Sequence, residues 1–289
     1  MRRAEGPAVL VVSAVMSACS LVSLDGLTGG HVVVTPDSGS SSGGSDSGGQ
    51  DTAPADVYVV PQGAYAAAVL MDAPVAYWRL DETSGTTARD SSGRGNDAAY
   101  IGGVHPGTAG AIANDPDTAA TFDGASGYLD GGDRFAFAGA QPFSIEAWVR
   151  ASSTSGYLGV ASREDTSGGP PSEGYIVFVS PDDGVFGFQR LDGASLTSIT
   201  STSMASASSY VHLVATYDGG QMTLYVNGMQ EITQTATFSI AGAGNDFVVG
   251  AEAGGAEAFF DGALDEVAVY DHVLTAERVT AHYMVGTGQ

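Results

Sequence analysis

Alternating side chains in residues 143–150 constrain the fold of this chain more than any other feature of its sequence. The segment reads FSIEAWVR, and in a pleated strand every second residue points to the same side. One face would then carry Phe143, Ile145, Ala147 and Val149, and the other Ser144, Glu146, Trp148 and Arg150. A helix has a period of 3.6 residues and would mix these two sets, so the pattern predicts a β-strand.

Two hairpins are predicted further along the chain. Residues 211–217 and 222–226 are rich in β-branched and aromatic side chains, and Asp218-Gly219-Gly220 separates them. Asn227-Gly228 follows, a dipeptide that tolerates the positive φ angles of a tight turn. We therefore expect three consecutive antiparallel strands.

The rest of the chain repeats this arrangement of short strands and turns. Further β-rich runs at 175–180, 185–190 and 247–250 lie between clusters of Gly, Asp, Ser and Thr. Many short strands with regular turns indicate an all-β, two-sheet antiparallel sandwich. A short carboxyl-terminal helix is expected over residues 276–284, capped by Thr275 and stopped by Gly286.

Five segments in this order and spacing resemble the LamG-like jelly-roll family of the concanavalin A-like lectin and glucanase superfamily. They are residues 76–96, 120–132, 143–150, 211–228 and 259–275. The resemblance covers about residues 64–286 and implies the jelly-roll fold. Tyr210 stands where the family usually has Trp, and Asp271-His272 replaces a usual Asn-Arg pair; both lie at predicted element edges.

The amino terminus has the composition of an export signal. Arg2 and Arg3 precede an apolar run at 8–16, which is too short for a membrane-spanning helix of about 20 residues. The sequence Met16-Ser17-Ala18-Cys19 resembles the lipobox of bacterial lipoproteins, which implies lipidation of Cys19. The alternative is an ordinary secretory signal with an incidental cysteine. Residues 1–18 are predicted to be the signal peptide, and the protein to be lipid-anchored to the bacterial cell envelope, at the outer membrane or surface, or else secreted.

Residues 19–55 are rich in Ser, Gly and Asp and contain few large apolar side chains. Such a segment cannot bury enough apolar surface to offset the entropy lost on ordering, so it is predicted to be a disordered tether. The folded jelly-roll domain is assigned to residues 56–289. Membrane contact is expected only through the amino-terminal lipid.

The net charge of the chain disfavours some classes of binding partner. Its formal net charge is −23 at pH 7. Such an acidic protein repels nucleic acid and anionic lipids, whereas cations and neutral ligands are compatible with it. We therefore expect a glycan or an extracellular protein as partner, and no nucleic acid.

Catalysis is not predicted. The glucanase branch of the superfamily places carboxylates at i, i+2 and i+4 on one strand, but the corresponding positions here are Glu146, Trp148 and Arg150. Asp265 and Glu266 are adjacent and should face opposite sides, and the acidic residues Glu164, Asp165, Glu252 and Glu257 lie in sequence typical of loops. The histidines are scattered, and Gly-x-Ser-x-Gly occurs only at residues 39–43, inside the Ser- and Gly-rich run where no strand-to-helix elbow is expected, so no nucleophile and base are indicated. His212 is interpreted as an ordinary structural residue.

Calcium is the cofactor that the sequence suggests. Residues 90–97 combine oxygen donors with glycines, and calcium prefers six to eight oxygen ligands. The family resemblance implies a structural calcium between such a loop and an acidic residue near the last strand, here Asp90, Asn96 and Asp265, with backbone carbonyls such as that of Gly95. The alternative is that Asp90 forms an Asx turn and Asp265 caps a strand through hydrogen bonds.

The predicted function is a non-catalytic binding module on the cell envelope or surface, with carbohydrate as the favoured ligand. A sugar site needs exposed aromatic rings and polar anchors, and the candidate rings are those of Tyr128, Trp148, Tyr157, Tyr175 and Phe188. Aromatic residues in strands are more often core, so no ligand-binding residue is assigned. The alternatives are a protein-interaction or adhesion module and, less favoured, a glycoside hydrolase of the glucanase type.

Overall fold

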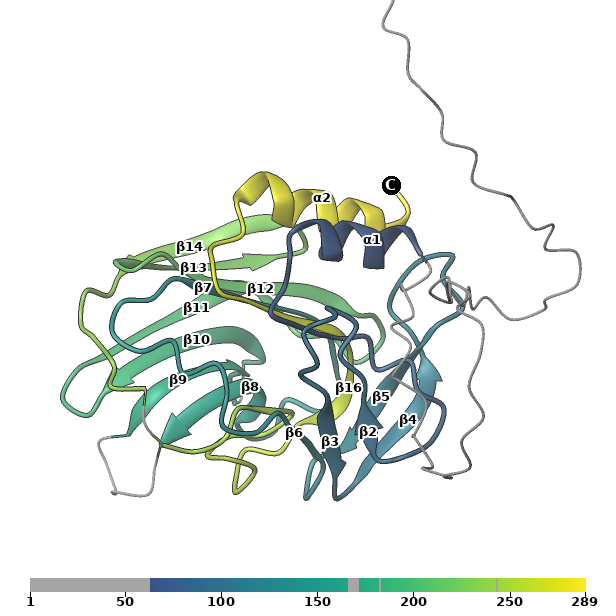
Figure 1. Ribbon diagram of the computed structural model, residues 1–289, viewed down its shortest axis with the longest axis horizontal. Helices are drawn as coiled ribbons and strands as arrows, with labels where there is room; N and C mark the ends of the chain where they lie inside the picture. The colour runs from purple at the N-terminus through teal and green to yellow at the C-terminus, as the bar shows by residue number, and fades with distance from the viewer. Residues whose placement is uncertain (1–62, 166–171, 182, 243) are drawn as a thin grey trace, which may run out of the picture. The chain divides into compact units, whose positions relative to one another are not determined.

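The computed structural model describes residues 63–165, 172–181, 183–242 and 244–289. Two eight-stranded sheets form this part of the chain, and their strand pairs are antiparallel (Figure 1). The predicted signal peptide, the lipidation site at Cys19 and the tether lie outside the described residues. In the described part of the chain, neither helix has the length and apolarity needed to cross a membrane.

The first sheet, here called sheet A, consists of β1 (Ala76–Trp78), β4 (Val104–Ala109), β5 (Thr118–Asp123), β7 (Phe143–Ala151), β12 (Val211–Tyr217), β13 (Gln221–Val226), β14 (Met229–Thr235) and β16 (Asp261–Tyr270). Its order is β14-β13-β12-β7-β16-β5-β4, with β1 paired to β16. Both predicted hairpins are present, because β12, β13 and β14 are consecutive neighbours. Asn227 and Gly228 have the positive φ angles, 50° and 77°, that their turn was expected to need.

The second sheet, sheet B, consists of β2 (Thr87–Ala88), β3 (Ala98–Ile101), β6 (Tyr128–Asp130), β8 (Leu158–Asp165), β9 (Glu173–Val179), β10 (Val185–Asp192), β11 (Leu196–Met204) and β15 (Val248–Val249). Its order is β11-β10-β9-β8-β15-β6-β3-β2. Neighbours that are distant in sequence, such as β15 between β8 and β6, show that the chain crosses repeatedly between the two sheets. This arrangement confirms the predicted jelly-roll sandwich.

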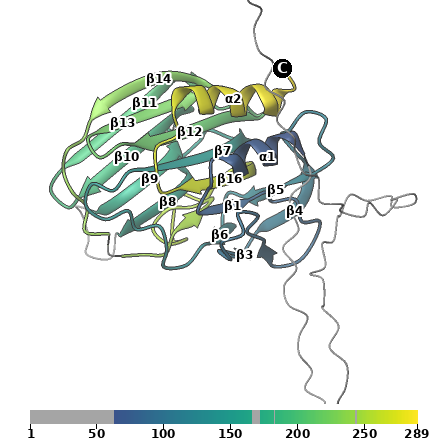
Figure 2. The same ribbon diagram turned by 45° about the horizontal axis from the view of Figure 1, so that its top comes forward.

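Two helices lie on the outer face of sheet A (Figures 1 and 2). They are α1 (Ala64–Met71) and α2 (Ala276–Thr287), one from each end of the described chain. The Thr275 side chain accepts a hydrogen bond from the Arg278 N–H, as expected of the helix cap. The predicted end of α2 is wrong: the helix continues through Gly286, and Gly288 closes it with a left-handed conformation.

Sheet A therefore separates two apolar cores. The alternate residues Phe143, Ile145, Ala147 and Val149 of β7 point into the core between the sheets. The opposite face of β7 carries Trp148, which packs in a second core between sheet A and the helices. We call these the intersheet core and the helix–sheet core. The alternation of β7 is as predicted, but both of its faces are buried.

Candidate functional site

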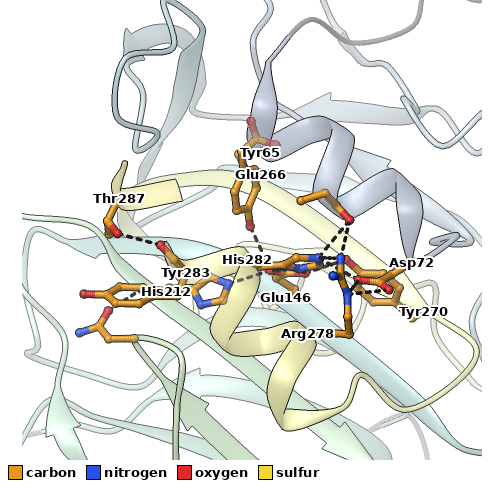
Figure 3. A network of polar contacts seen from close by, with 12 residues as sticks. Tyr65, Asp72, Glu146, His212, Glu266, Tyr270, Arg278, His282, Tyr283 and Thr287 are labelled. Atoms are coloured by element: carbon orange, nitrogen blue, oxygen red, sulfur yellow. Dashed lines mark hydrogen bonds and ion pairs between the residues drawn. The ribbon is translucent and has the colours of Figure 1, made fainter. Parts of the chain in front are cut away.

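A buried carboxylate lies at the centre of the helix-covered face of sheet A. Glu146 of β7 has no solvent exposure. Its Oε1 accepts hydrogen bonds from the Tyr65 hydroxyl at 3.0 Å and His212 Nε2 at 2.7 Å, and its Oε2 accepts one from the Tyr270 hydroxyl at 2.6 Å. His282 Nδ1 lies 3.0 Å from Oε1 and 3.1 Å from Oε2. These groups come from α1, β12, β16 and α2, so the carboxylate joins both helices to the sheet (Figure 3).

The second ring nitrogen of His282 extends the network toward solvent. His282 Nε2 lies 2.9 Å from Asp72 Oδ2 and 3.1 Å from the carbonyl oxygen of Ala68. Arg278 donates to both carboxylate oxygens of Asp72 and to the same carbonyl (Figure 3). The side chains of Asp72 and Arg278 are 16% and 32% exposed, whereas His282 and Glu146 are at 0%. We call Glu146, His282, Asp72 and Arg278 the charged clamp.

The pKa shifts agree with a charged pair at the buried end of the clamp. Burial by itself would raise the pKa of Glu146, but the charge of His282 and hydrogen bonds from His212 and His282 hold it well below its ordinary value. Burial would likewise lower the pKa of His282, but the charge of Glu146 and its hydrogen bond raise it. Ionised Glu146 and protonated His282 therefore stabilise each other.

This burial removes Glu146 from direct contact with a ligand in the described conformation. Trp148, a candidate for sugar stacking, is 3% exposed and packs between Tyr65 and Tyr283. Tyr175 and Phe188 lie in the intersheet core at 0%. Of the aromatic candidates, the structure leaves the rings of Tyr128 and Tyr157 partly exposed.

Two adjacent carboxylates on β16 share one face, contrary to the sequence prediction. β16 pairs with β7 through Asp265↔Trp148 and Ala268↔Glu146, so β16 holds one extra residue between these pairs. The extra residue forms a β-bulge in which Glu266 has a φ of 52°. Trp148 and Glu146 both point to the helix-covered face. Because of the bulge, Asp265 and Glu266 both lie on that face as well.

The pair forms a second buried polar cluster, centred on Arg79. Arg79 Nε lies 3.3 Å from Glu266 Oε1, and its guanidinium also contacts Asp117. The Tyr77 hydroxyl donates to Glu266. Burial, followed by the charge of Asp265, raises the pKa of Glu266 well above its ordinary value.

The residues predicted to bind calcium are only partly brought together. Asp90 Oδ1 accepts from the N–H groups of Tyr77 at 3.0 Å and Ser92 at 2.9 Å. Oδ2 accepts from the Ser92 hydroxyl and the Asn96 N–H, both at 2.8 Å. Gly95 has a φ of 75° in the same loop. Four donors surround this carboxylate, which is the Asx-turn alternative and leaves its oxygens poorly placed to bind a cation.

Asp265, the remaining predicted ligand, lies elsewhere. Its Oδ2 accepts from the Ala111 N–H at 2.6 Å, while its Oδ1 is buried without a hydrogen-bond partner. Among the described residues, the hydrogen bonds of Asp265 do not involve Asp90 or Asn96. That part of the chain also contains no group of three or more His, Cys, Asp or Glu side chains able to hold a metal. The donor set therefore does not fit the expected calcium site, although calcium binding itself stays a prediction.

The outer face of sheet B differs from that of sheet A because polar side chains on it reach solvent. The strand register places Thr200, Gly187 and Phe178 in one row across β11, β10 and β9. The next row holds Ser198, Gln189 and Ile176. Ser198 and Thr200 are exposed, and the Gln189 amide donates to the Ser198 hydroxyl at 3.2 Å.

Two stacked aromatic rings, those of Phe178 and Tyr157, lie beside these polar side chains. A Cβ at Gly187 would overlap the Phe178 ring, so the glycine lets this ring lie across β10. Tyr157 stacks on Phe178 with ring centroids 4.3 Å apart and an interplanar angle of 19°. The partly exposed Tyr157 ring is therefore the outermost layer. We call Tyr157, Gln189, Ser198 and Thr200 the sheet B platform.

A carboxyl pair adjoins Tyr157. Glu164, expected in a loop, belongs to β8 and is 4% exposed. Burial and a hydrogen bond with Glu164 raise the pKa of Glu252 to about 9. Glu252 is therefore protonated at neutral pH.

The two antiparallel sheets and their strand order define a jelly-roll protein. A family model described as the concanavalin A-like lectin/glucanases superfamily matches residues 122–280. The chain belongs to this superfamily, and the predicted LamG-like resemblance is confirmed. A search of curated proteins found no match.

Solved structures share the fold at low sequence identity. The binding domain of Paraclostridial Mosquitocidal Protein 1 is 14% identical with a TM-score of 0.56, covering 74% of this chain and 52% of that one. The binding domain of botulinum neurotoxin serotype G is also 14% identical, with a TM-score of 0.54 and coverages of 73% and 51%. This chain thus spans about half the length of these domains. At such identities the likeness shows the fold alone.

Sequence reasoning missed the clamp. In the sequence, His282 is one of several scattered histidines, and no local pattern indicates a role for Tyr65 or Asp72. One signal was available: Arg278 and His282 are four residues apart on the predicted helix and so share a face. Their acidic partners lie on α1 and β7, and only the tertiary fold places these nearby.

Proposed function

We propose that the protein is a non-catalytic binding module whose ligand is a carbohydrate, held on the sheet B platform. The observation that carries this proposal is the placement of a partly exposed Tyr157 ring on the same sheet face as the exposed hydroxyl groups of Ser198 and Thr200 and the partly exposed amide of Gln189. Sugars present apolar C–H faces and rings of hydroxyl groups. An aromatic ring suits the former, and amide and hydroxyl side chains suit the latter.

The sheet B platform lies across three neighbouring strands, β11, β10 and β9. Neighbouring strands are about 4.8 Å apart, and same-face residues along one strand are about 6.6 Å apart. Phe178, on which Tyr157 stacks, lies in the same row as Thr200, two strand spacings away. Ser198 and Gln189 lie in the neighbouring row. A ligand crossing the strands would therefore meet the ring and the polar groups together. The net charge of −23 favours a neutral or cationic sugar over an anionic one.

The carboxylates support binding without catalysis. Glu146, the strand residue that a superfamily hydrolase would use, is buried beneath two helices. A hydrolase of the glucanase type is therefore the less favoured alternative.

A glycan-array screen followed by calorimetry tests the proposal. We expect the protein to bind neutral oligosaccharides, and Tyr157→Ala and Gln189→Ala each to weaken the best ligand at least tenfold. Gln230→Ala is the matched control, because Gln230 is an exposed glutamine on β14 of the other sheet. Equal affinity of Tyr157→Ala, Gln189→Ala and the control for the ligand would place binding elsewhere. Turnover of a β-glucan or galactan that Glu146→Gln abolishes would contradict the non-catalytic assignment.

A protein ligand is the second candidate. Leu196 and Met204, the two end residues of edge strand β11, are 58% and 60% exposed, so a protein that covered this strand would bury apolar surface at both of its ends. The similar toxin structures are also named binding domains. Absence of glycan binding, with loss of binding to a purified surface protein in Leu196→Ser, would favour this candidate.

The proposed location follows from the amino terminus alone. We propose that the protein is exported and lipid-anchored to the bacterial cell envelope through Cys19. The predicted tether would then hold the binding module away from the membrane.

A further inference from the structure

The charged clamp contains a histidine whose hydrogen bonds assign its protonation state. His282 Nδ1 faces the carboxylate of Glu146, and Nε2 faces the carboxylate of Asp72 and the carbonyl of Ala68. An ionised carboxylate and a carbonyl can only accept hydrogen bonds. Arg278 Nη2, a donor, also lies 3.4 Å from Nε2, but the carboxylate and the carbonyl are closer to this nitrogen, at 2.9 and 3.1 Å. Both ring nitrogens therefore donate to their nearest neighbours, and the ring that does so is the imidazolium.

His212 provides an internal comparison. Its Nε2 faces the same Glu146 oxygen at 2.7 Å, but its Nδ1 is buried without a hydrogen-bond partner. A proton on Nδ1 would be an unsatisfied buried donor, which is costly, so His212 is neutral with its proton on Nε2. The two buried histidines thus have different charges because their second nitrogens have different surroundings.

The resulting clamp is electrically balanced. Glu146 and Asp72 supply two negative charges, and His282 and Arg278 supply two positive charges. Loss of the proton from His282 would leave Glu146 buried without an opposite charge, and it would leave one ring nitrogen facing an acceptor with no hydrogen to donate. An uncompensated buried charge is strongly destabilising.

The clamp acts on a structural unit with its own apolar core. Helices α1 and α2 contact the helix–sheet core through Tyr65, Val69 and Val279, while the intersheet core lies on the other side of sheet A. Such a division allows local opening of one layer while the rest stays folded. We propose that protonated His282 fastens α1 and α2 to sheet A, and that its deprotonation releases both helices and uncovers the aromatic face beneath them.

The direction of the pH dependence follows from the shifted groups. The pKa of His282 is raised in the folded protein, so its stabilisation is complete below the ordinary histidine pKa of about 6.5 and is lost as pH rises through the folded pKa. The pKa of Glu146 is lowered, so its contribution is present above about 4.5 and is lost as pH falls through the folded pKa. The clamp therefore stabilises the folded protein most between about pH 4.5 and pH 6.5.

The other titratable groups facing His282 and Glu146 are Asp72, Arg278, His212, Tyr65 and Tyr270. Burial, followed by the charge of Glu146, raises the pKa of both tyrosines well above 10. These phenols stay neutral through the range in which His282 loses its proton. If the helices open between about pH 6.5 and 10 and this opening depends on His282, its cause is therefore the loss of the His282 proton and not the ionisation of Tyr65 or Tyr270.

The chain's two tryptophans make the opening measurable. Trp148 lies in the helix–sheet core and Trp78 in the intersheet core. In Trp78→Phe, fluorescence of Trp148 reports the helices, and in Trp148→Phe, that of Trp78 reports the sandwich. In moderate denaturant we expect the Trp148 signal to report opening before the Trp78 signal. Its opening constant should rise about tenfold per pH unit above pH 6.5 until the folded pKa of His282 is reached.

His282→Gln should remove this pH dependence, whereas His272→Gln should keep it, because His272 is an exposed histidine beside Asp271. If His282→Gln folds poorly, nitrogen NMR of the wild-type imidazole provides the second measurement. We expect both His282 nitrogens to be protonated at pH 7 and His212 to be neutral. A neutral His282 at pH 7 would overturn the inference. A single opening of both tryptophans, unchanged in His282→Gln, would do the same.

Discussion

Glu146 and Asp90 show how individual carboxylates are satisfied in this protein. Glu146 receives its hydrogen bonds from tyrosines and histidines of four different elements, whereas Asp90 receives its bonds from residues that are close to it in sequence or on β1. The sequence predicts an Asx turn at Asp90 as one of two alternatives, because two of its partners, Ser92 and Asn96, are only two and six residues away. The environment of Glu146 could not be predicted, since its partners are 66 to 136 residues away in sequence.

Asp90 gives a prediction at the residue scale. Because four donors already satisfy its carboxylate, Asp90→Ala should lower the free energy of unfolding by about 2 kcal/mol, the cost of leaving partly buried N–H groups unpaired. We expect the loss to be the same in calcium and in EDTA when melting is followed by circular dichroism.

The calcium hypothesis predicts the opposite result. A ligand that binds the folded state alone stabilises it by about 2.7 kcal/mol at a hundredfold excess over its Kd. If EDTA lowers the melting temperature of the wild type but changes that of Asp90→Ala and Asp265→Ala only slightly, the two residues bind calcium.

At the element scale, helix α2 shows that Gly286 has a different role from the helix stop that the sequence predicts. Gly286 was expected to stop the helix, but it lies within α2, where a Cβ would overlap the indole ring of Trp148. The residue is therefore small because the helix approaches β7 closely. Gly288, with a φ of 73°, has the helix-ending conformation instead.

These two interpretations of Gly286 give opposite expectations for Gly286→Ala. If the residue merely stopped a helix, alanine would be neutral or would favour a longer helix. Because alanine would overlap Trp148, we expect a loss of about 1 to 3 kcal/mol in urea unfolding. Gly220→Ala is the control, since a Cβ there meets no atom closer than 3.8 Å. An unchanged midpoint in Gly286→Ala would contradict the close-approach explanation.

At the scale of the whole molecule, the described sandwich and the amino-terminal segment make separate contributions. The sandwich has a helix-covered sheet and a sheet with an exposed polar face, so the proposed binding surface and the proposed clamp lie on different sheets. Binding at the platform and opening of the clamp can therefore be tested independently. Loss of glycan binding in Tyr157→Ala should leave the pH dependence of the Trp148 signal unchanged.

Cys19 gives the prediction that concerns location. Small residues precede this cysteine and a Ser- and Gly-rich segment follows it, so we expect the cells to attach labelled palmitate to the protein. Cys19→Ala should lose the label and move from the membrane to the soluble fraction. Label on the Cys19→Ala protein, or its absence from the wild type, would show that the cysteine is incidental.

The sequence by itself determined the class of fold, because strand alternation, turn dipeptides and helix caps are local properties of neighbouring residues. It predicted β7, the hairpins around Asp218 and Asn227, and the start of α2 at Thr275. The tertiary structure alone decided which polar groups meet. The bulge at Glu266 brings two adjacent acids to one face, and the docking of α1 and α2 buries Glu146 with His282. Such contacts join residues far apart in the chain, and no local pattern records them.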